Sequence, residues 1–248
     1  MSGQINIRFY EELNDFLPIA RRKLAFDCRF RQAGSIKDLI ESLGVPHTEV
    51  DLILVNGESV DFSYRIQDGD RISVYPVFET LDITPVIHLR PKPLRETCFV
   101  LDTHLGRLAA YLRLLGFDTL YHNDYDDPTL SDISVNEHRI LLTCDKKLLM
   151  RKLITHACYI HEREPQKQLL EILIRLDLFE QQHPFSRCMH CNGVIHPVDK
   201  ESIETHLMPR TREYYNEFWQ CDKCMKIYWK GSHYQRMQQL IAELNIKH

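Results

Sequence analysis

Two closely spaced pairs of cysteines place the strongest constraint on how this chain can fold. Cys188 and Cys191 form the first CxxC pair, and Cys221 and Cys224 form the second. Four thiolates from two such pairs satisfy a tetrahedral Zn²⁺ ion and leave no open position, which is typical of a structural site. The pairs therefore predict a zinc ribbon, which is favoured over a redox role because both pairs occur together. Four nearby histidines are less favoured alternative ligands: His190, His196, His206 and His233.

Composition and targeting signals favour a folded protein of the cytosol. The 248 residues are 44% hydrophobic and 27% charged, a balance that suits a globular chain with two or three folding units. We find neither an apolar run of membrane-spanning length nor a basic start followed by an apolar stretch, so we expect no membrane span and no secretory signal. Reducing thiols in the cytosol disfavour disulfides. The cysteines outside the two pairs are predicted to be small buried hydrophobes: Cys28, Cys98, Cys144 and Cys158.

Residues 1–80 have the pattern of a ubiquitin-like β-grasp domain. The segments INIRFY, DLILVN and RISVYPVF are strand-like, and SIKDLIESLG reads as a helix that begins at Ser35. Gly44 fits the end of this helix. Asn56 and Gly57 together are a strong signal for a type I′ hairpin turn.

The same domain resembles the ubiquitin-like sulfur-carrier group in LILVNGE and QDGDRISVYP. Those carriers end in Gly-Gly, whereas this last strand runs on through Tyr75, Pro76, Val77 and Phe78. The resemblance therefore implies a scaffolding or docking role without conjugation. Prolines among charged residues then predict an extended linker at residues 81–96.

Strands and helices alternate over residues 97–184, which predicts a parallel sheet covered by helices. The predicted strands are CFVLD, FDTLYH, RILLTCD and CYIH. The predicted helices are HLGRLAAYLRLLG, PTLSDISVNEHR, KKLLMRKL and QKQLLEILIRLDLF. Gly116 fits the end of the first helix, and Asp127 ahead of Pro128 fits the beginning of the second. The zinc ribbon and a C-terminal helix occupy residues 185–248. The predicted fold class is therefore α/β, with a β-grasp domain before the sheet and a ribbon after it.

Two of the predicted parallel strands end in an aspartate, Asp102 and Asp145. Ligands bind beyond the carboxyl ends of such strands, and carboxylates gathered there repel one another unless a cation lies between them. Oxygen ligands suit Mg²⁺ or Mn²⁺, which support in-line displacement at phosphorus. Further acids are expected from the run HNDYDDPTLSD, where Asp127 and Asp132 are favoured over Asp124 and Asp126.

Neighbouring side chains complete this hypothesis for the acidic site. The hydroxyls of Thr103 and Thr143 lie beside the strand-end aspartates in the sequence and could orient them. Candidates for phosphate contacts are Arg107, Arg113, Lys146 and Lys147. The alternative interpretation is that Asp102 and Asp127 are only helix N-caps, each worth about 1 kcal/mol.

Basic and aromatic side chains alternate between and after the cysteine pairs. The net charge of −4 excludes a polybasic nucleic-acid-binding protein, so phosphate contacts must come from a local patch or through metal. Cations interleaved with aromatic rings suit unpaired RNA. We expect Trp219 and Trp229 to pack in the core of the ribbon or at its edge. The candidate RNA contacts are Arg210, Arg212, Tyr228, Lys230, His233 and Arg236.

Several stretches of the chain resemble the RNase domain named for the C-terminus of the Mut-seven exonucleases. They are FVLDTHLGRLAAYLRLLGFDTLY, RILLTCDKKLL and the pair formed by CMHC and CDKCMKIYWKGSH. The resemblance covers roughly residues 97–237 and implies a PIN-like fold, metal-binding acids at Asp102 and Asp145, and zinc at the paired cysteines. Bacterial members of that family carry a ubiquitin-like domain ahead of it. The chain departs from the family pattern at Cys144, where Arg is usual, at Met189 in place of Pro, and at Ser134 in place of Ala. The first departure removes a candidate phosphate contact.

Two functions are compatible with these features. The favoured one is a cytoplasmic, metal-dependent ribonuclease that acts on RNA, either single-stranded or tRNA-like. The alternative is a non-catalytic RNA- or tRNA-binding zinc-ribbon protein that recruits a protein partner through its β-grasp domain. A sulfur-transfer accessory role is disfavoured, because the Gly-Gly terminus is absent from the β-grasp domain.

Overall fold

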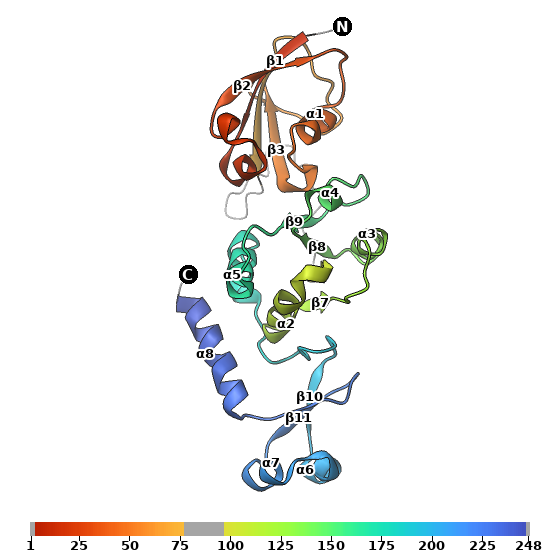
Figure 1. The fold of residues 1–248 in the computed structure, drawn as a ribbon, viewed down its shortest axis with the longest axis vertical. Coiled ribbons are helices and arrows are strands. Elements are labelled where there is room, and N and C mark those ends of the chain that lie inside the picture. Colours follow the sequence, from red (N-terminus) through yellow and green to blue (C-terminus); the bar gives the residue numbers. More distant parts are fainter. Residues whose placement is uncertain (1–2, 77–96, 247–248) are drawn as a thin grey trace. The chain divides into compact units, whose positions relative to one another are not determined.

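The computed structural model describes residues 3–76 and 97–246 (Figure 1). The chain divides into two compact units, the first made of residues 1–96 with 126–159 and the second of residues 97–125 with 160–248. The linker predicted at residues 81–96 lies outside the described residues.

The first unit begins with five strands and one helix. These are β1 (Gly3–Phe9), β2 (Ala25–Phe30), α1 (Ile36–Ser42), β3 (Val50–Val55), β4 (Glu58–Ser59) and β5 (Arg71–Pro76), with 3₁₀ turns at Glu11–Phe16, Ile19–Arg21 and His47–Glu49. The strands form one sheet in the order β2-β1-β5-β3-β4, in which β1 and β5 are parallel and the other pairs are antiparallel. This arrangement confirms the predicted β-grasp fold.

The local signals in this domain act as the sequence predicts. The Ser35 hydroxyl accepts a hydrogen bond from the Asp38 amide at 3.1 Å and so caps α1. Gly44 ends the helix region with a φ of 96°, which a residue with a Cβ rarely adopts. Asn56 and Gly57 have φ values of 54° and 94° and form the tight turn between β3 and β4.

The core of the β-grasp domain lies between the sheet and α1. Alternate residues of β1, Ile5, Ile7 and Phe9, are buried, as are Ile36 and Ile40 of α1. This alternation follows from the two-residue period of a strand. Each such side chain contributes about 1.5–3 kcal/mol when it is fully buried, so the apolar stripe of β1 fixes the register of the sheet.

The rest of the first unit packs against this domain. It contains α3 (Asp127–Asn136), β8 (Ile140–Thr143), α4 (Lys146–Leu149) and β9 (Ala157–Tyr159). The Glu49 carboxylate accepts a hydrogen bond from the Tyr159 amide at 2.6 Å, and His47 Nε2 lies 3.0 Å from the Ile154 carbonyl oxygen. The rings of Phe16 and Tyr159 meet edge to face at 5.2 Å. The β-grasp domain therefore docks on another segment of its own chain.

The second unit contains the remaining strands and helices of the α/β region. They are β6 (Cys98–Leu101), a 3₁₀ turn (Thr103–Leu105), α2 (Gly106–Leu114), β7 (Asp118–Leu120), α5 (Pro165–Arg175) and a 3₁₀ turn (Phe179–Gln181). β6 is parallel to β7 here, and β8 is parallel to β9 in the first unit. α2 packs on β7 and α5, whereas α3 and α4 pack on β8. These parallel pairs and their helices confirm the predicted α/β class.

Some predicted details are wrong by a residue or more. The cap of α3 is Asp126, whose carboxylate accepts from the Thr129 amide at 2.9 Å, so Asp127 is already the first helical residue. α4 ends at Leu149, although the sequence predicts helix up to Leu153. Cys144 is exposed because it follows the last residue of β8, whereas Cys158 is buried as expected. Cys28 and Cys98 are half-buried.

The ribbon forms the C-terminal part of the second unit. Its elements are β10 (Ile195–Val198), α6 (Lys200–Ile203), a 3₁₀ turn (Glu204–His206), α7 (Pro209–Tyr214), β11 (Phe218–Cys221), β12 (Ile227–Tyr228) and α8 (Ser232–Ile246). β11 lies between β10 and β12 in an antiparallel sheet. In the part of the chain that the structure describes, every helix is too short or too polar to span a membrane.

Candidate metal centre and nucleic-acid groove

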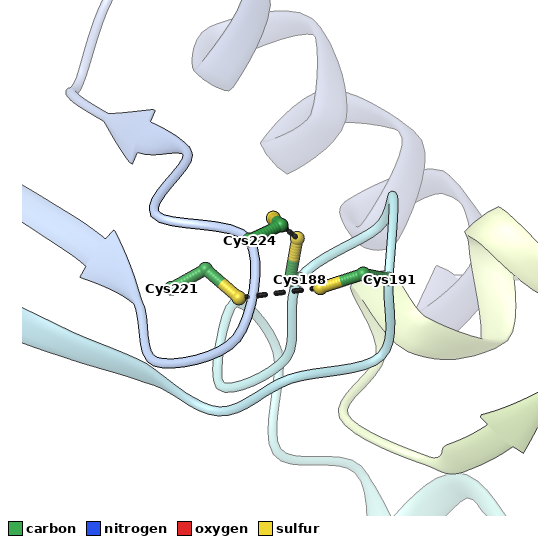
Figure 2. A group of neighbouring side chains, drawn as sticks. All are labelled: Cys188, Cys191, Cys221 and Cys224. Carbon is green, nitrogen blue, oxygen red and sulfur yellow. Dashed lines mark hydrogen bonds between the residues drawn. The ribbon is translucent and has the colours of Figure 1, made fainter.

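Four cysteine sulfur atoms converge between the two loops of the ribbon (Figure 2). The Sγ atoms of Cys188, Cys191, Cys221 and Cys224 all lie within 4.8 Å of one another. The Cys188–Cys224 and Cys191–Cys221 separations are 3.6 and 3.3 Å. Sulfur ligands placed about 2.3 Å from a tetrahedral ion lie about 3.8 Å apart, so the cluster has the dimensions of a metal site.

The backbone of each CxxC loop turns back on itself directly after the second cysteine. Asn192 and Met225 occupy this position in the two loops, and both have left-handed φ values, 67° and 58°. In the first loop the Asn192 amide donates to the Cys188 carbonyl at 2.9 Å, and in the second the Lys223 amide lies 3.4 Å from Cys221 Sγ. A Cβ on Gly193 would lie 2.6 Å from the same sulfur, so only glycine fits there. The predicted turn at Asn192 and Gly193 therefore brings the two loops together.

The close packing of the cysteines shifts the pKa values of two of their thiols, Cys188 and Cys224. Burial raises the pKa of the Cys224 thiol to about 12. At Cys188 burial also raises the pKa, but hydrogen bonds from the Tyr228 hydroxyl and from the Cys191 and His190 amides outweigh it, and the pKa falls to about 7. Thiolates this close repel one another unless a cation holds them, so the site suits a bound metal ion.

Arg113 of α2 joins the first CxxC loop to the α/β region of the same unit. Its Nη1 donates to the carbonyl oxygens of His190 and Met189 at 2.9 and 3.2 Å, and its Nε donates to Thr119 at 2.9 Å. The side chain is buried, with 5% of its surface exposed. The sequence suggested Arg113 as a phosphate contact, but its guanidinium is enclosed by backbone carbonyls and holds the loop in place.

Asn192 makes a second connection between the ribbon and the strand β7. Its side-chain amide donates to the Asp118 carboxylate at 2.9 Å, and its side-chain oxygen accepts from the Thr119 amide at 3.0 Å. Asp118 also pairs with Arg187 at 3.3 Å. These buried and half-buried contacts were not predicted, because nothing local to Asn192 marks its partner.

The strand-end aspartates both begin helical turns. The Asp102 carboxylate accepts from the Thr103 amide at 2.6 Å, and the Thr103 hydroxyl lies 3.3 Å from the same oxygen. Asp145 accepts from the Lys147 amide at 2.8 Å and caps α4. The buried Thr143 hydroxyl accepts from the Asp145 amide at 2.9 Å. The two threonines thus shape the turns that carry the aspartates.

Of the remaining acidic candidates, Asp127 and Asp132 lie on α3 in the first unit, and Asp124 lies in the second unit. Asp127 forms an ion pair with Arg151 at 3.5 Å. Asp132 is exposed on the same helix, and the exposed Asp124 lies 3.6 Å from His122. Among the described residues, we searched for groups of three or more His, Cys, Asp or Glu side chains with the spacing of a metal site. The group found consists of the four cysteines.

The basic candidates differ in how far they are engaged elsewhere. Arg107 is exposed on α2. The Lys146 ammonium lies 4.6 Å from the ring centre of Phe16 and 5.6 Å from that of Tyr159, so it packs on aromatic rings of the first unit. Burial lowers the pKa of Lys146, and the nearby Arg22 lowers it further.

A groove of about 1000 Å³ lies beside the cysteine cluster, between β11, β12, α7 and the beginning of α8. It takes in four of the predicted RNA contacts, Arg210, Tyr228, Lys230 and His233. Arg212 and Arg236 do not line it; Arg212 lies 3.8 Å from Glu204. Other lining residues are Phe185, Tyr214, Tyr215, Trp219, Lys226, Trp229 and Tyr234.

Several predicted RNA contacts also have structural partners. The Tyr228 hydroxyl lies 3.0 Å from Cys188 Sγ, so this residue contacts the cysteine cluster. Lys230 donates to Glu217 at 2.8 Å and lies over the ring of Trp219 at 5.1 Å. Trp219 is half-buried, whereas Trp229 is 37% exposed at the edge of the groove. The aromatic positions therefore divide between the ribbon core and an open surface.

Fold and metal centre together define an α/β protein with a ubiquitin-like domain ahead of it and a four-cysteine ribbon behind it. The family model of the Mut7-C RNAse domain matches residues 97–241, and that of the Mut7-C ubiquitin domain matches residues 2–82. The chain belongs to the Mut7-C RNAse domain family. No curated protein matches the chain.

Proposed function

We propose that the protein is a metal-dependent ribonuclease that hydrolyses phosphodiester bonds of RNA through an aspartate cluster. The match of residues 97–241 to an RNase family carries this proposal. The domain boundaries that we propose are a β-grasp domain at 1–80, a linker at 81–96, a nuclease domain at 97–184 and a ribbon at 185–248. The proposed catalytic acids are Asp102, Asp127, Asp132 and Asp145.

Asp102 and Asp145 are the best supported of these acids, because each follows a strand of a parallel pair. A carboxylate has two oxygens and about four acceptor sites, so a helix cap leaves it able to bind a cation. Carboxylate oxygens suit Mg²⁺ or Mn²⁺, which would lower the pKa of a water molecule and stabilise charge at phosphorus when bound. Asp127 and Asp132 are five residues apart and so about 140° apart around α3, so the two carboxylates cannot both bind the same ion.

The cysteine site belongs to the same proposal in a structural role. Four sulfur donors with this spacing favour Zn²⁺, and four ligands leave no open position for catalysis. A reducing cytoplasm would keep these thiols available for the ion. We assign RNA contacts to the ribbon and protein contacts to the β-grasp domain.

The decisive experiment measures cleavage of a labelled, unstructured RNA by the zinc-loaded full chain, with and without Mg²⁺ or Mn²⁺. We expect Asp102→Asn and Asp145→Asn each to lower the rate at least about 100-fold, because groups that only support a metal ligand already contribute 10–100-fold. Both variants should fold, since the Asn side-chain oxygen can accept the same backbone amide.

Asp61→Asn is the matched control for these variants. Asp61 lies in the β-grasp domain and accepts from the Ser63 amide at 2.8 Å, so the change removes one charge and keeps a similar turn. Its cleavage rate should equal that of the unaltered chain. Cleavage without added metal, or full activity in both strand-end variants, would rule the proposal out.

A non-catalytic RNA-binding protein is the second candidate function. The observation that favours it is that Asp102 and Asp145 both cap helical turns, a structural role that needs no ion. In that case the RNA affinity of Asp102→Asn would equal or exceed that of the unaltered chain, and no product would form with either.

A further inference from the structure

The groove beside the cysteine cluster has a charge opposite to that of the whole chain. The chain carries a net charge of −4, yet the groove is lined by four cationic side chains, two histidines and no carboxylate. The cations are Arg187, Arg210, Lys226 and Lys230. A surface of this sign in an acidic protein favours a polyanionic ligand.

Two of these cations are available to a ligand. Arg187 pairs with Asp118 at 3.3 Å, and Lys230 pairs with Glu217 at 2.8 Å. Within residues 3–76 and 97–246, the charged groups of Arg210 and Lys226 have no ion-pair partner, and both residues are exposed. A polyanion would therefore meet two positive charges that the fold has not neutralised.

The walls of the groove are mostly aromatic and partly open. Tyr214 is 72% exposed at the end of α7, and Trp229 is 37% exposed after β12. Trp229 is held on one side by Tyr215, with ring centres 6.3 Å apart, and by Gly231, where a Cβ would lie 2.9 Å from the indole nitrogen. An aromatic ring fixed at a surface beside cations suits the stacking of a planar base. An acidic peptide has no such base to stack.

We propose that this groove binds an unpaired stretch of RNA, with bases stacked on Tyr214 and Trp229 and phosphates held by Arg210 and Lys226. The volume of about 1000 Å³ is at the upper end for small-ligand pockets, so it suits a chain segment better than a single small molecule. The proposal deepens the ribonuclease function and rests on it, since it names unpaired RNA as the substrate class.

The chain carries its own probe for this test. Its two tryptophans, Trp219 and Trp229, both line the groove, so intrinsic tryptophan fluorescence reports on this site alone. The zinc-loaded full chain is titrated with oligouridylate in the absence of Mg²⁺ and Mn²⁺, which prevents the proposed cleavage. We expect saturable quenching by oligouridylate, and much weaker quenching by an RNA duplex of equal length or by polyglutamate.

Four variants locate the binding residues. Tyr214→Ala should weaken binding about 5-fold or more, since stacking contributes about 1–3 kcal/mol per base, whereas Tyr214→Phe should keep the affinity. The double variant Arg210→Ala with Lys226→Ala should reduce the dependence of log affinity on log salt concentration by about 1.4, because each phosphate that a cation neutralises contributes about 0.7 to that slope. Arg212→Ala is the matched control, because Arg212 lies on the same helix, is exposed and does not line the groove.

Each opposite outcome overturns the proposal. Equal quenching by the duplex would show that base stacking is not required, and equal quenching by polyglutamate would identify a site for acidic peptides. An unchanged affinity in Tyr214→Ala, or an equal loss of affinity in Arg212→Ala, would remove the groove from RNA binding. Failure of the nuclease proposal looks different, because oligouridylate would still quench the fluorescence while added metal produced no cleavage.

Discussion

At the scale of single residues, Tyr228 connects the cysteine cluster to the groove. Its ring lines the groove while its hydroxyl lies 3.0 Å from Cys188 Sγ. Burial raises the pKa of the Tyr228 hydroxyl, and the hydrogen bond to Cys188 raises it further, so the hydroxyl stays protonated and can donate to a thiolate. The sequence suggested only an RNA contact here, because the pairing with Cys188 spans 40 residues.

Tyr228→Phe should speed release of the bound metal while the ribbon keeps its fold. Partners of metal ligands contribute about 10–100-fold in metal affinity, so we expect a release rate about 10-fold faster or more. The measurement is transfer of the ion to a chromogenic chelator in excess. Tyr214→Phe makes the same chemical change at an exposed ring and should leave the rate unaltered. Equal rates for the two variants would show that the Tyr228 hydroxyl does not support the site.

At the scale of secondary structure, α2 carries two arginines with opposite roles. Arg113 is enclosed and donates to three carbonyl oxygens, whereas Arg107 is exposed on the same helix. Helical periodicity does not separate them, because an arginine at the edge of an apolar stripe can face either solvent or another element.

Arg113→Met should therefore destabilise the second unit. The change leaves the carbonyl oxygens of Thr119, Met189 and His190 without this donor, and a buried polar group without a partner costs about 1–3 kcal/mol. We expect a loss of about 3 kcal/mol or more in the free energy of unfolding, measured by urea denaturation of the zinc-loaded chain. Arg107→Met should stay within about 0.5 kcal/mol of the unaltered chain. Similar losses in both variants would contradict the structural role of Arg113.

The helix α5 is tied to the loop before it by one carboxylate. Glu171 accepts from the His161 and Glu162 amides at 3.1 Å each and lies 2.8 Å from His161 Nδ1. Burial raises the pKa of Glu171, but these hydrogen bonds outweigh it, and the net pKa is lowered. A carboxylate whose folded pKa is lowered contributes stability above its unfolded pKa, about 4.3, and this contribution is lost as the pH falls through the folded value.

Glu171→Gln tests this contribution of α5. At pH 7 we expect the variant to lose about 1–3 kcal/mol in the free energy of unfolding, since it replaces hydrogen bonds to a charged group. The difference from the unaltered chain should shrink as the pH falls below about 4.3. Urea denaturation over the acidic to neutral range measures both effects, and Glu164→Gln, at an exposed position, should show neither. A difference that does not change with pH would contradict a charged Glu171.

At the scale of the whole molecule, the proposed zinc ion should stabilise one unit selectively. The ribbon is held to β7 and α2 by Asn192, Arg187 and Arg113, all within the second unit. The β-grasp domain has its own apolar core in the first unit. Structural zinc contributes folding free energy directly, so its removal should first destabilise the ribbon and the segments on which it packs.

Removal of metal by a chelator should expose amides of β10, β11 and β12 to hydrogen exchange, together with the Thr119 amide that Asn192 holds. Amides of β1, β3 and β5 should keep their protection. Readdition of Zn²⁺ should restore the protection of the ribbon, and Mg²⁺ should not. Uniform deprotection across both units would show that the metal stabilises the entire chain.

Much of the architecture was predictable because its signals are local. The helix and turn signals involve only residues close in the sequence, as at Ser35, Gly44 and the pair Asn56 and Gly57. The alternation of apolar residues along β1 likewise indicates which face of the strand is buried. The two CxxC pairs indicate a metal site by residue type and spacing alone. Such signals can misplace an element by one residue. The cap of α3 is Asp126 and not Asp127, and both are aspartates within two residues of the same proline.

The amino-acid sequence by itself determined the β-grasp order, the parallel α/β pattern and the four-cysteine site, because propensity, periodicity and ligand spacing operate over short stretches of chain. The tertiary structure alone decided that Arg113 is buried under the carbonyl of His190, 77 residues away, and that cations and aromatic rings from α7, β11, β12, α8 and neighbouring loops line one groove. These features depend on which distant segments pack together, and no local pattern of residues specifies that choice.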